Sequence, residues 1–236
     1  MAKYDFYSSK KTSSVWKILV KKFYNHFEGM LRNEVKKSEN PAIIEVGPGA
    51  GEIAHICENN RWKYKGVESN ARLQEALVHQ GFDVAHAQVP PLPENDDSFS
   101  CAVALNVLEH SQSLGNASGM LAEFYRVLRS EGVLILIVPS YLDWGKSFYN
   151  LDYTHSFITT EIRLSQMLAD QGFKKITVSY HYACFFGRTG LFLRIVSKAV
   201  FGFAGMLLPL KVRRSLKFQK MANTFAENII VKAYKS

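Results

Sequence analysis

"IIEVGPGAGEIAHI", residues 43–56, is the stretch of sequence that decides the fold. Its apolar start is typical of a buried strand, and it continues through Glu45 into three glycines at alternate positions, Gly47, Gly49 and Gly51. Glycine lets the chain turn sharply and lets a ligand approach the backbone, and the first turn of a helix offers unpaired N–H groups. The stretch therefore predicts a strand, a tight ligand-binding turn and a helix.

The rest of the chain alternates between strand and helix patterns. Such an alternation implies right-handed crossovers and a mostly parallel sheet with helices on both faces. Ligands bind such sheets at the carboxyl ends of the strands. Besides a strand at 40–47 and the helix after Gly51, the pattern predicts strands at 63–69, 82–87, 98–106, 133–140, 174–182 and 226–235, and helices at 14–36, 70–81, 119–132 and 160–173.

The net charge of +8 is spread unevenly along the 236 residues. Residues 1–40 carry nine Lys/Arg and four Asp/Glu, residues 41–185 carry ten and sixteen, and residues 186–236 carry ten and one. The basic ends of the chain suit an anionic partner, and the candidates are a membrane surface, a phosphorylated substrate and RNA. A solvated basic surface with no partner is the alternative.

The cysteines and the N-terminal residues bear on the cellular compartment. Cys57, Cys101 and Cys184 are far apart, so they form no metal-binding spacing and no disulfide framework. The first fifteen residues are polar and basic, without an apolar stretch of signal-peptide length. Both features predict a cytoplasmic protein, because reduced cysteines are typical of that compartment.

An acid after the second strand makes the glycine turn more specific. Glu68 ends that strand about 20 residues beyond the turn, where an acid can accept hydrogen bonds from two ribose hydroxyls. The spacing G-P-G-A-G differs from the G-x-G-x-x-G of dinucleotide-binding enzymes. An acid before G-x-G-x-G, followed by an acid that ends strand two, resembles the class I S-adenosylmethionine-dependent methyltransferases.

Three further segments resemble that family in the same order. They are "QVPPLPENDDSFSCAVALNVLEH" (88–110), "FYRVLRSEGVLILIVPS" (124–140) and "DYTHSFITTEIRLSQMLADQGF" (152–173). The resemblance covers about residues 40–182 and the last strand. It implies an α/β, Rossmann-like sheet of seven mostly parallel strands with helices on both faces, an antiparallel last strand and a helical insertion before it.

One domain of residues 1–236 is the expected organisation. We divide it into an N-terminal helical cap (1–40), a cofactor-binding core (41–182), an apolar and basic helical insertion (183–225) and the last strand (226–236).

The resemblance implies S-adenosylmethionine as cofactor and S-adenosylhomocysteine as product. Glu45 and the glycine turn would hold the methionine portion, and Glu68 the ribose. The family often has an acid after strand three that contacts the adenine amino group, and here Gln88 takes that place. The full predicted cofactor set is Glu45, Gly47, Pro48, Gly49, Gly51, Glu68, Ser69, Gln88, Val89, Asn106, Val107 and His110.

Candidate catalytic residues lie in the D-x-T-H segment. An oxygen nucleophile needs a base to take its proton, and His155 is the first candidate, with Asp152 nearby to orient it. The alternative is a histidine that only shapes the pocket. His110 is expected as a pocket wall beside the cofactor. Four aromatic residues in the loop after strand five are predicted to lie over the acceptor, and packing within the protein is the alternative. They are Tyr141, Trp144, Tyr149 and Tyr153.

The segment after strand four excludes some acceptors. "NVLEH" stands where methyltransferases of DNA bases carry Asn/Asp-Pro-Pro-aromatic, so nucleic acid is not the expected partner. Ubiquinone-pathway O-methyltransferases have a similar Glu-His after strand four. In some of them this segment, with a further acid upstream, resembles a metal site. Asn106 occupies the place of that acid, so no metal is predicted.

The insertion between the last two strands has an apolar run at 191–210, just long enough to span a membrane. The run contains a narrow stripe at helical spacing, formed by Arg194, Lys198, Gly202 and Gly205. This pattern favours a helix that lies on another surface with its wide apolar face toward that surface. Basic residues follow up to Lys220 and suit anionic headgroups. Residues 191–220 are therefore a candidate peripheral membrane contact. A lid or packed helix, a true span and a dimer contact are the alternatives.

The layout is similar to methyltransferases of bacterial surface-polysaccharide and lipid-linked glycan pathways. It implies O-methylation of a small-molecule or glycan-type acceptor in cell-envelope biosynthesis, in the cytoplasm or at the inner membrane face. Alternatives are O-methylation of a quinone-type ring at the membrane surface, and a scaffold that binds the cofactor without turnover. The charge alone also leaves an RNA-binding methyltransferase open.

Overall fold

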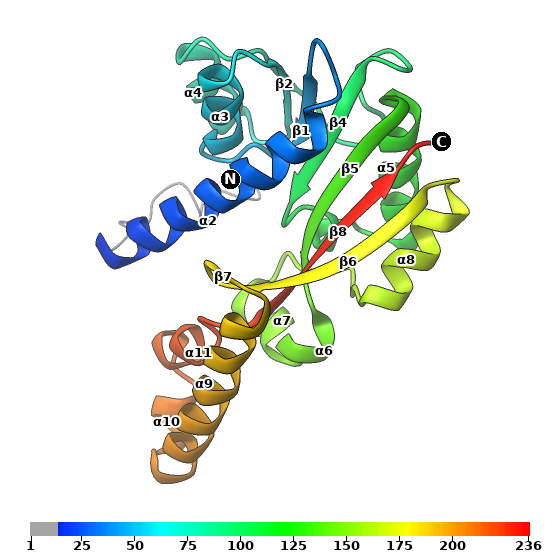
Figure 1. The fold of residues 1–236 in the computed structure, drawn as a ribbon. Coiled ribbons are helices and arrows are strands. Elements are labelled where there is room, and N and C mark those ends of the chain that lie inside the picture. The colour runs from blue at the N-terminus through cyan, green and yellow to red at the C-terminus, as the bar shows by residue number, and fades with distance from the viewer. Residues whose placement is uncertain (1–13) are drawn as a thin grey trace.

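An eight-stranded sheet with the order β3-β2-β1-β4-β5-β8-β6-β7 forms the centre of the protein (Figure 1). The computed structural model describes the backbone of residues 14–236 and the side chains from residue 17 onward. The first thirteen residues of the predicted cap lie outside this part. The strands are β1 (Ala42–Val46), β2 (Lys63–Glu68), β3 (Val84–His86), β4 (Phe99–Leu105), β5 (Leu128–Pro139), β6 (Lys174–Tyr182), β7 (Phe185–Phe186) and β8 (Glu227–Tyr234).

The strand directions confirm the predicted fold. β1 pairs in parallel with β2 and β4, and β3 and β5 continue the parallel sheet on either side. β8 runs antiparallel between β5 and β6. The count differs from the predicted seven because β6 folds back into β7, a strand of two residues. Ala183 makes this turn in a left-handed conformation, with φ at 54°.

Helices cover both faces of the sheet, as predicted. On one face Phe27 of α2 and Ile53 of α3 pack against Ile43 of β1, and on the other Phe124 of α5 and Leu164 of α8 belong to the larger apolar cluster. The helices are α2 (Ser14–Val35), α3 (Glu52–Asn59), α4 (Ala71–His79), η1 (Leu108–His110), α5 (Leu114–Val127), α6 (Tyr141–Trp144), α7 (Ser147–Leu151), α8 (Glu161–Asp170), α9 (Gly187–Leu207), α10 (Leu210–Arg213) and α11 (Leu216–Ala222).

The boundary between α5 and β5 differs from the predicted helix at 119–132. The helix ends at Val127, and Leu128 already pairs with Phe99 of β4 before the register shifts. Gly132, the last residue of the predicted helix, lies inside the strand. A β-carbon there would lie 2.8 Å from the backbone oxygen of Arg129, so the glycine permits a tight irregularity in the strand.

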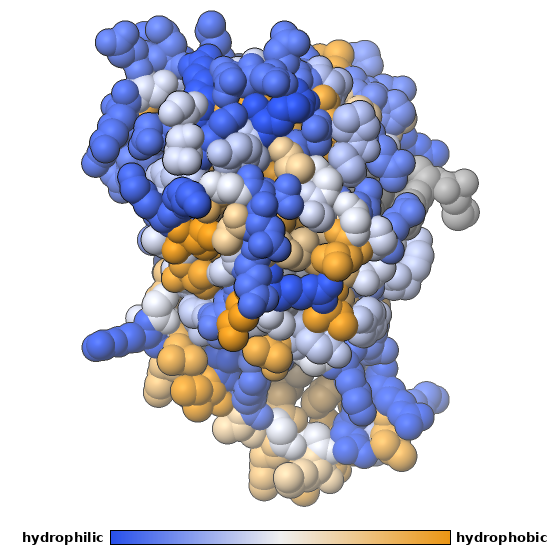
Figure 2. Space-filling model, turned by 90° about the vertical axis from the view of Figure 1, so that its right-hand side faces the viewer, coloured by the Kyte–Doolittle hydropathy of each residue, from blue (hydrophilic) through white to orange (hydrophobic). Residues whose placement is uncertain are grey.

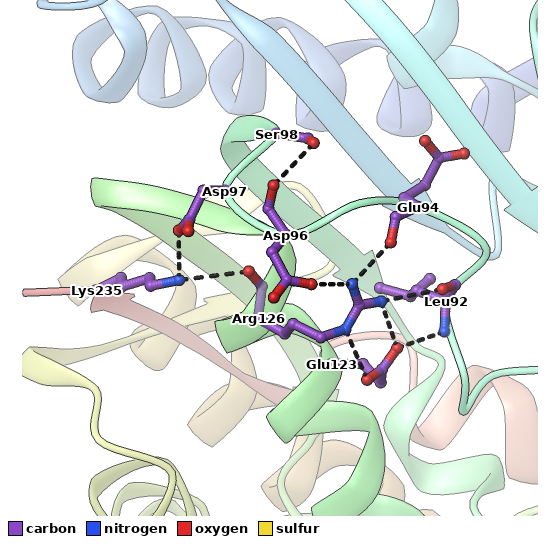
Figure 3. Close-up of polar contacts among 8 residues, drawn as sticks. All are labelled: Leu92, Glu94, Asp96, Asp97, Ser98, Glu123, Arg126 and Lys235. Carbon is purple, nitrogen blue, oxygen red and sulfur yellow. Dashed lines mark hydrogen bonds and ion pairs between the residues drawn. The ribbon is translucent and has the colours of Figure 1, made fainter.

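Arg126 of α5 fixes the loop that leads from β3 to β4 (Figure 3). Its guanidinium donates hydrogen bonds to the backbone oxygens of Leu92 (3.0 Å) and Glu94 (2.7 Å). It also donates to the carboxylates of Asp96 and Glu123 at 2.7 to 3.0 Å. Glu123 in turn accepts from the backbone N–H of Leu92 at 2.7 Å. Two predicted cofactor residues, Gln88 and Val89, lie in the same loop before the residues that Arg126 bonds.

The insertion forms an arm of three helices, α9 to α11, at one end of the molecule (Figure 1). The polar side of α9 faces the protein. Arg194 is buried, and its Nε lies 2.8 Å from Oδ2 of Asp143 in α6, while Lys198 pairs with Oδ1. The predicted stripe through Arg194 and Lys198 therefore contacts the body, and the wide apolar face of α9 points outward.

We predict that Arg126→Lys lowers the free energy of unfolding by about 2 to 4 kcal/mol. A lysine ammonium cannot reproduce a planar fork that bonds two carboxylates and two carbonyls, and hydrogen bonds to charged groups contribute about 1.5 to 3 kcal/mol each. Urea denaturation measures the change. Arg61→Lys, at an exposed position, is the control and should change stability by less than about 0.5 kcal/mol. Equal effects at both positions would contradict the role of Arg126.

Candidate functional site

The glycine turn between β1 and α3 brings bare backbone against the end of β4. Gly47 has φ at 73°, and a β-carbon there would lie only 2.6 Å from Cγ2 of Val107. Gly51 has φ at 90°, and its β-carbon would lie 2.5 Å from Leu77. Neither position tolerates a side chain without a shift of its neighbour. The turn is therefore a cradle that only glycines can form.

Glu68 ties the turn to the end of β2. Its buried carboxylate accepts a hydrogen bond from the backbone N–H of Asn70 at 2.9 Å and one from that of Gly49 at 3.4 Å. Asn70 then caps α4, because its side-chain oxygen accepts from the backbone N–H groups of Arg72 and Leu73. The acid thus lies at the predicted place, next to the loop where a ribose would lie.

A cavity of about 560 Å³ opens at the carboxyl ends of these strands, within the usual size of small-molecule sites. It brings together six predicted cofactor residues: Gly47, Ser69, Gln88, Val89, Val107 and His110. Sequence reasoning missed Asn70, His86, Asn116 and Met120, which also line it. The N-cap position of Asn70 before an apolar-periodic helix was the only available signal. A second hollow, beside Ala42 and Lys63, lies where strands begin, away from the glycine turn.

The other predicted cofactor residues lie outside this lining. Glu45 points to the face covered by α2 and α3, where its Oε2 accepts a hydrogen bond from the hydroxyl of Tyr64 at 2.7 Å. Burial raises the pKa of Glu45 to about 8. The backbone oxygen of Pro48 closes the turn by accepting from the N–H of Gly51. Asn106 is exposed at the end of β4, with φ at 54°. Direct cofactor contacts of these three residues stay predictions.

His155 is held in one tautomer by a backbone carbonyl. Its Nδ1 lies 2.8 Å from the oxygen of Phe148, which can only accept, so Nδ1 carries the proton and Nε2 carries a lone pair. Burial lowers the pKa of His155 and the charge of Asp152 opposes this effect, with the net result below the ordinary value. The imidazole is therefore neutral near pH 7, as a general base must be.

Asp152 does not orient His155 by a hydrogen bond, in contrast to the prediction, since Nε2 and Oδ2 are 3.8 Å apart. Its other oxygen accepts from the backbone N–H and the hydroxyl of Thr154, at 2.9 and 2.7 Å. The Thr154 hydroxyl lies 2.9 Å from Nδ1 of His110 and, having donated to Asp152, accepts there. Asp152 therefore orients His110 through Thr154, and it acts on His155 only through its charge.

The side chain of Glu109 lies close to the rings of His110 and His155. Its side chain is fully buried, and among the described residues neither carboxylate oxygen has a hydrogen-bond partner. Burial raises the pKa of Glu109 to about 8. One ligand atom from each of Glu109, His110 and His155 lies within 4.8 Å of the others, an arrangement that could hold a divalent cation. No metal was predicted because Asn106 stands in the place of an upstream acid, and the sequence does not show that His155 meets Glu109 and His110.

The four predicted aromatic residues are divided between two roles. Trp144 donates its indole N–H to the backbone oxygen of Glu227 at 2.8 Å, so it ties α6 to β8. Tyr141 packs edge-on against Phe148, and Tyr149 also touches both rings. Tyr149 and Tyr153 are exposed. Contact of these residues with an acceptor stays a prediction.

The profile of a protein family described as "Methyltransferase domain" matches residues 22–178, more than half of the chain. The chain belongs to this family. A comparison with curated proteins found no significant match in sequence.

Solved structures share the fold. A SAM-dependent methyltransferase from Archaeoglobus fulgidus matches with a TM-score of 0.57 at 16% identity, over 93% of this chain and 99% of that one. One from Thermotoga maritima matches with 0.58 at 16% identity, over 94% and 93%. Phosphoethanolamine N-methyltransferase 2 of Haemonchus contortus, in complex with S-adenosyl-L-methionine, matches with 0.63 at 15% identity. That match covers 89% of this chain and 52% of the other, so this chain spans about half of that protein.

The family and the fold together define a class I, S-adenosylmethionine-dependent methyltransferase. The cofactor is S-adenosylmethionine. The residues present fit it, because Gly47 lines the cavity, open space faces Gly49 in the same turn, and the carboxylate of Glu68 lies beside that turn.

We predict that Gly49→Ala abolishes measurable binding of S-adenosylhomocysteine at a stability cost of only about 1 to 2 kcal/mol. Gly49 has φ at 57°, so alanine is strained, but no atom lies within 4 Å of the added carbon. Any loss of affinity therefore reports a ligand that approaches this backbone. Calorimetry and urea denaturation measure the two quantities. Gly81→Ala, with φ at 93° and open space, is the matched control and should retain the affinity. Unchanged affinity in Gly49→Ala would make the turn merely structural.

Proposed function

We propose that this protein methylates a hydroxyl oxygen of a glycan-type or other small-molecule acceptor in cell-envelope biosynthesis. The observation that carries the proposal is His155, whose neutral imidazole presents the Nε2 lone pair beside His110, a residue that lines the cofactor cavity. A hydroxyl is a weak nucleophile and gains from a base that takes its proton as it attacks. An acceptor nitrogen that is already neutral needs no such base.

When bound, the cofactor supplies a methyl group on a positively charged sulfur. The protein's own part is to place the acceptor oxygen in line with that group and to receive the proton. Nε2 of His155 takes the hydroxyl proton, while Nδ1–H stays bonded to the oxygen of Phe148. The carboxylate of Asp152, 3.8 Å from Nε2, stabilises the imidazolium that forms.

His110 is the second donor or acceptor at this place. Its ring centroid lies 5.0 Å from that of His155, and the hydroxyl of Thr154 fixes its Nδ1. It thus lies next to both the cofactor cavity and His155 and can bond the acceptor. The basic ends of the chain and the exposed rings of Tyr149 and Tyr153 suit a phosphate-bearing glycan, which offers charge and apolar sugar faces.

The unpartnered carboxylate of Glu109 favours a second form of the same reaction. A divalent cation held by Glu109, His110 and His155 would bind the acceptor oxygen and lower the pKa of its proton. His155 would then be a ligand and not a base. Chelation distinguishes the two forms, because only the second loses activity with EDTA and regains it with added metal.

We predict that His155→Gln lowers the rate of methyl transfer by roughly 100-fold or more while S-adenosylhomocysteine still binds. Transfer of labelled methyl groups is measured with nucleotide sugars and polyprenyl-linked glycans as acceptors, and with phosphoethanolamine as an amine acceptor. His79→Gln, an exposed histidine of α4, is the control. The transfer rate of the native protein should decline with falling pH only at pH values below the ordinary pKa of histidine. The reason is that the pKa of His155 is lowered and its neutral form is the base. Transfer to amine acceptors alone, or full activity of His155→Gln, would contradict the proposal.

A further inference from the structure

The helix α9 is inverted relative to an ordinary surface helix. Its polar side chains Arg194 and Ser197 are buried against the protein, and only 17% of its most apolar 18-residue window is buried. Seven exposed apolar residues lie at helical spacing and form one face: Phe192, Ile195, Val196, Val200, Phe203, Met206 and Leu207. A surface helix normally buries this kind of face. The outward face of α9 therefore needs a partner.

Ion pairs hold the helix in this orientation. Asp143 of α6 pairs with both Arg194 and Lys198, and the guanidinium of Arg194 also donates to the backbone oxygens of Ala222 (3.1 Å) and Asp143 (3.3 Å). Breaking a buried pair leaves an uncompensated charge away from water, which is strongly unfavourable. By length and composition α9 could cross a membrane. Leaving the body to do so would break these contacts, so the geometry favours a helix that stays on the protein.

The surroundings of this face are basic. Residues 187–225 carry eight Lys/Arg and no Asp/Glu. Lys211, Arg214, Lys217 and Lys220 of the segment that follows α9 are exposed. Further apolar side chains, Leu210, Val212 and Leu216, are exposed among these cations. Figure 2 shows apolar side chains gathered at the lower end of the molecule, the end that the arm forms in Figure 1. A broad apolar face beside several cations is the pattern of a helix that lies in a membrane interface.

We propose that the face of α9, together with the cations of α10 and α11, is a docking surface for an anionic phospholipid bilayer. The apolar side chains enter the boundary between headgroups and acyl chains, and the lysines and arginines bind the anionic headgroups. A second copy of the chain fits less well, because a two-fold contact would place the same acid-free basic segments near each other.

The docked arm would also place the reaction at the membrane. Asn223, just after α11, donates to the hydroxyl of Ser147 in α7 at 3.0 Å. The next residue, Phe148, supplies the oxygen that fixes His155. The surface and the proposed base are therefore joined by one short helix. This link rests on the proposed function, whereas bilayer binding itself does not.

The test is cosedimentation of the full chain with vesicles of phosphatidylcholine alone and of phosphatidylcholine with phosphatidylglycerol. We expect binding to the anionic vesicles and affinity roughly tenfold or more weaker without phosphatidylglycerol. Phe203→Asp/Met206→Asp changes side chains that are 66% and 82% exposed, and it should lower vesicle affinity by roughly tenfold or more. Lys211→Glu/Arg214→Glu should do the same.

Matched controls separate this face from general effects. Val78→Asp/Ile162→Asp places two aspartates at exposed apolar positions of α4 and α8, and Lys36→Glu/Lys37→Glu reverses two exposed charges after α2. Both controls should bind vesicles like the native chain. Binding of S-adenosylhomocysteine, measured without acceptor or lipid, checks that each variant is folded.

Three results would overturn the proposal. They are absence of vesicle binding by the native chain, equal loss in variants and controls, and a dimer in light scattering that Phe203→Asp/Met206→Asp dissociates. The last would assign the face to a second copy.

Discussion

The close approach of Gly47 to Val107 is the constraint on which the cofactor site depends. β1 and β4 are neighbours in the sheet, and the turn after β1 passes so near the end of β4 that a β-carbon would lie 2.6 Å from Val107. This contact leaves a cavity between the turn, the end of β2 and the loop after β3. Glu68 then accepts a hydrogen bond from the N–H of Gly49 in the turn, and Arg126 donates hydrogen bonds to carbonyls of the loop.

A single segment after β5 serves the site and the arm together. Its first helix, α6, carries Asp143, which holds α9 in its inverted orientation. The next, α7, contains Phe148, whose carbonyl sets the tautomer of His155. The D-x-T-H residues follow and fix His110 through Thr154. The backbone N–H groups of Ser156 and Phe157 donate to the backbone oxygen of Glu109 and so hold this segment against η1. The proposed base and the proposed membrane surface thus share one support.

The parts predicted well from the sequence are those with local causes. Glycine spacing and apolar periodicity are properties of neighbouring residues, and they predicted β1, β2, β6, the turn between β1 and α3, and the place of Glu68. Orientation was harder, because it depends on partners distant in the chain. The spacing of Arg194 and Lys198 predicted a narrow polar stripe, but no local pattern shows that the stripe pairs with Asp143, which lies 51 residues before Arg194. Likewise, the meeting of Glu109 with His155 requires the tertiary fold.

The central claim is that the glycine turn and Glu68 bind S-adenosylmethionine. Calorimetric titration with S-adenosylhomocysteine and, separately, with NAD tests this claim most directly. The titrations are made on the native chain, on Glu68→Ala and on Glu75→Ala, which controls for the loss of an exposed acid. We predict micromolar binding of S-adenosylhomocysteine, weakened roughly tenfold or more in Glu68→Ala alone, and no binding of NAD. Binding of NAD, or equal affinity for S-adenosylhomocysteine in all three proteins, would contradict the account.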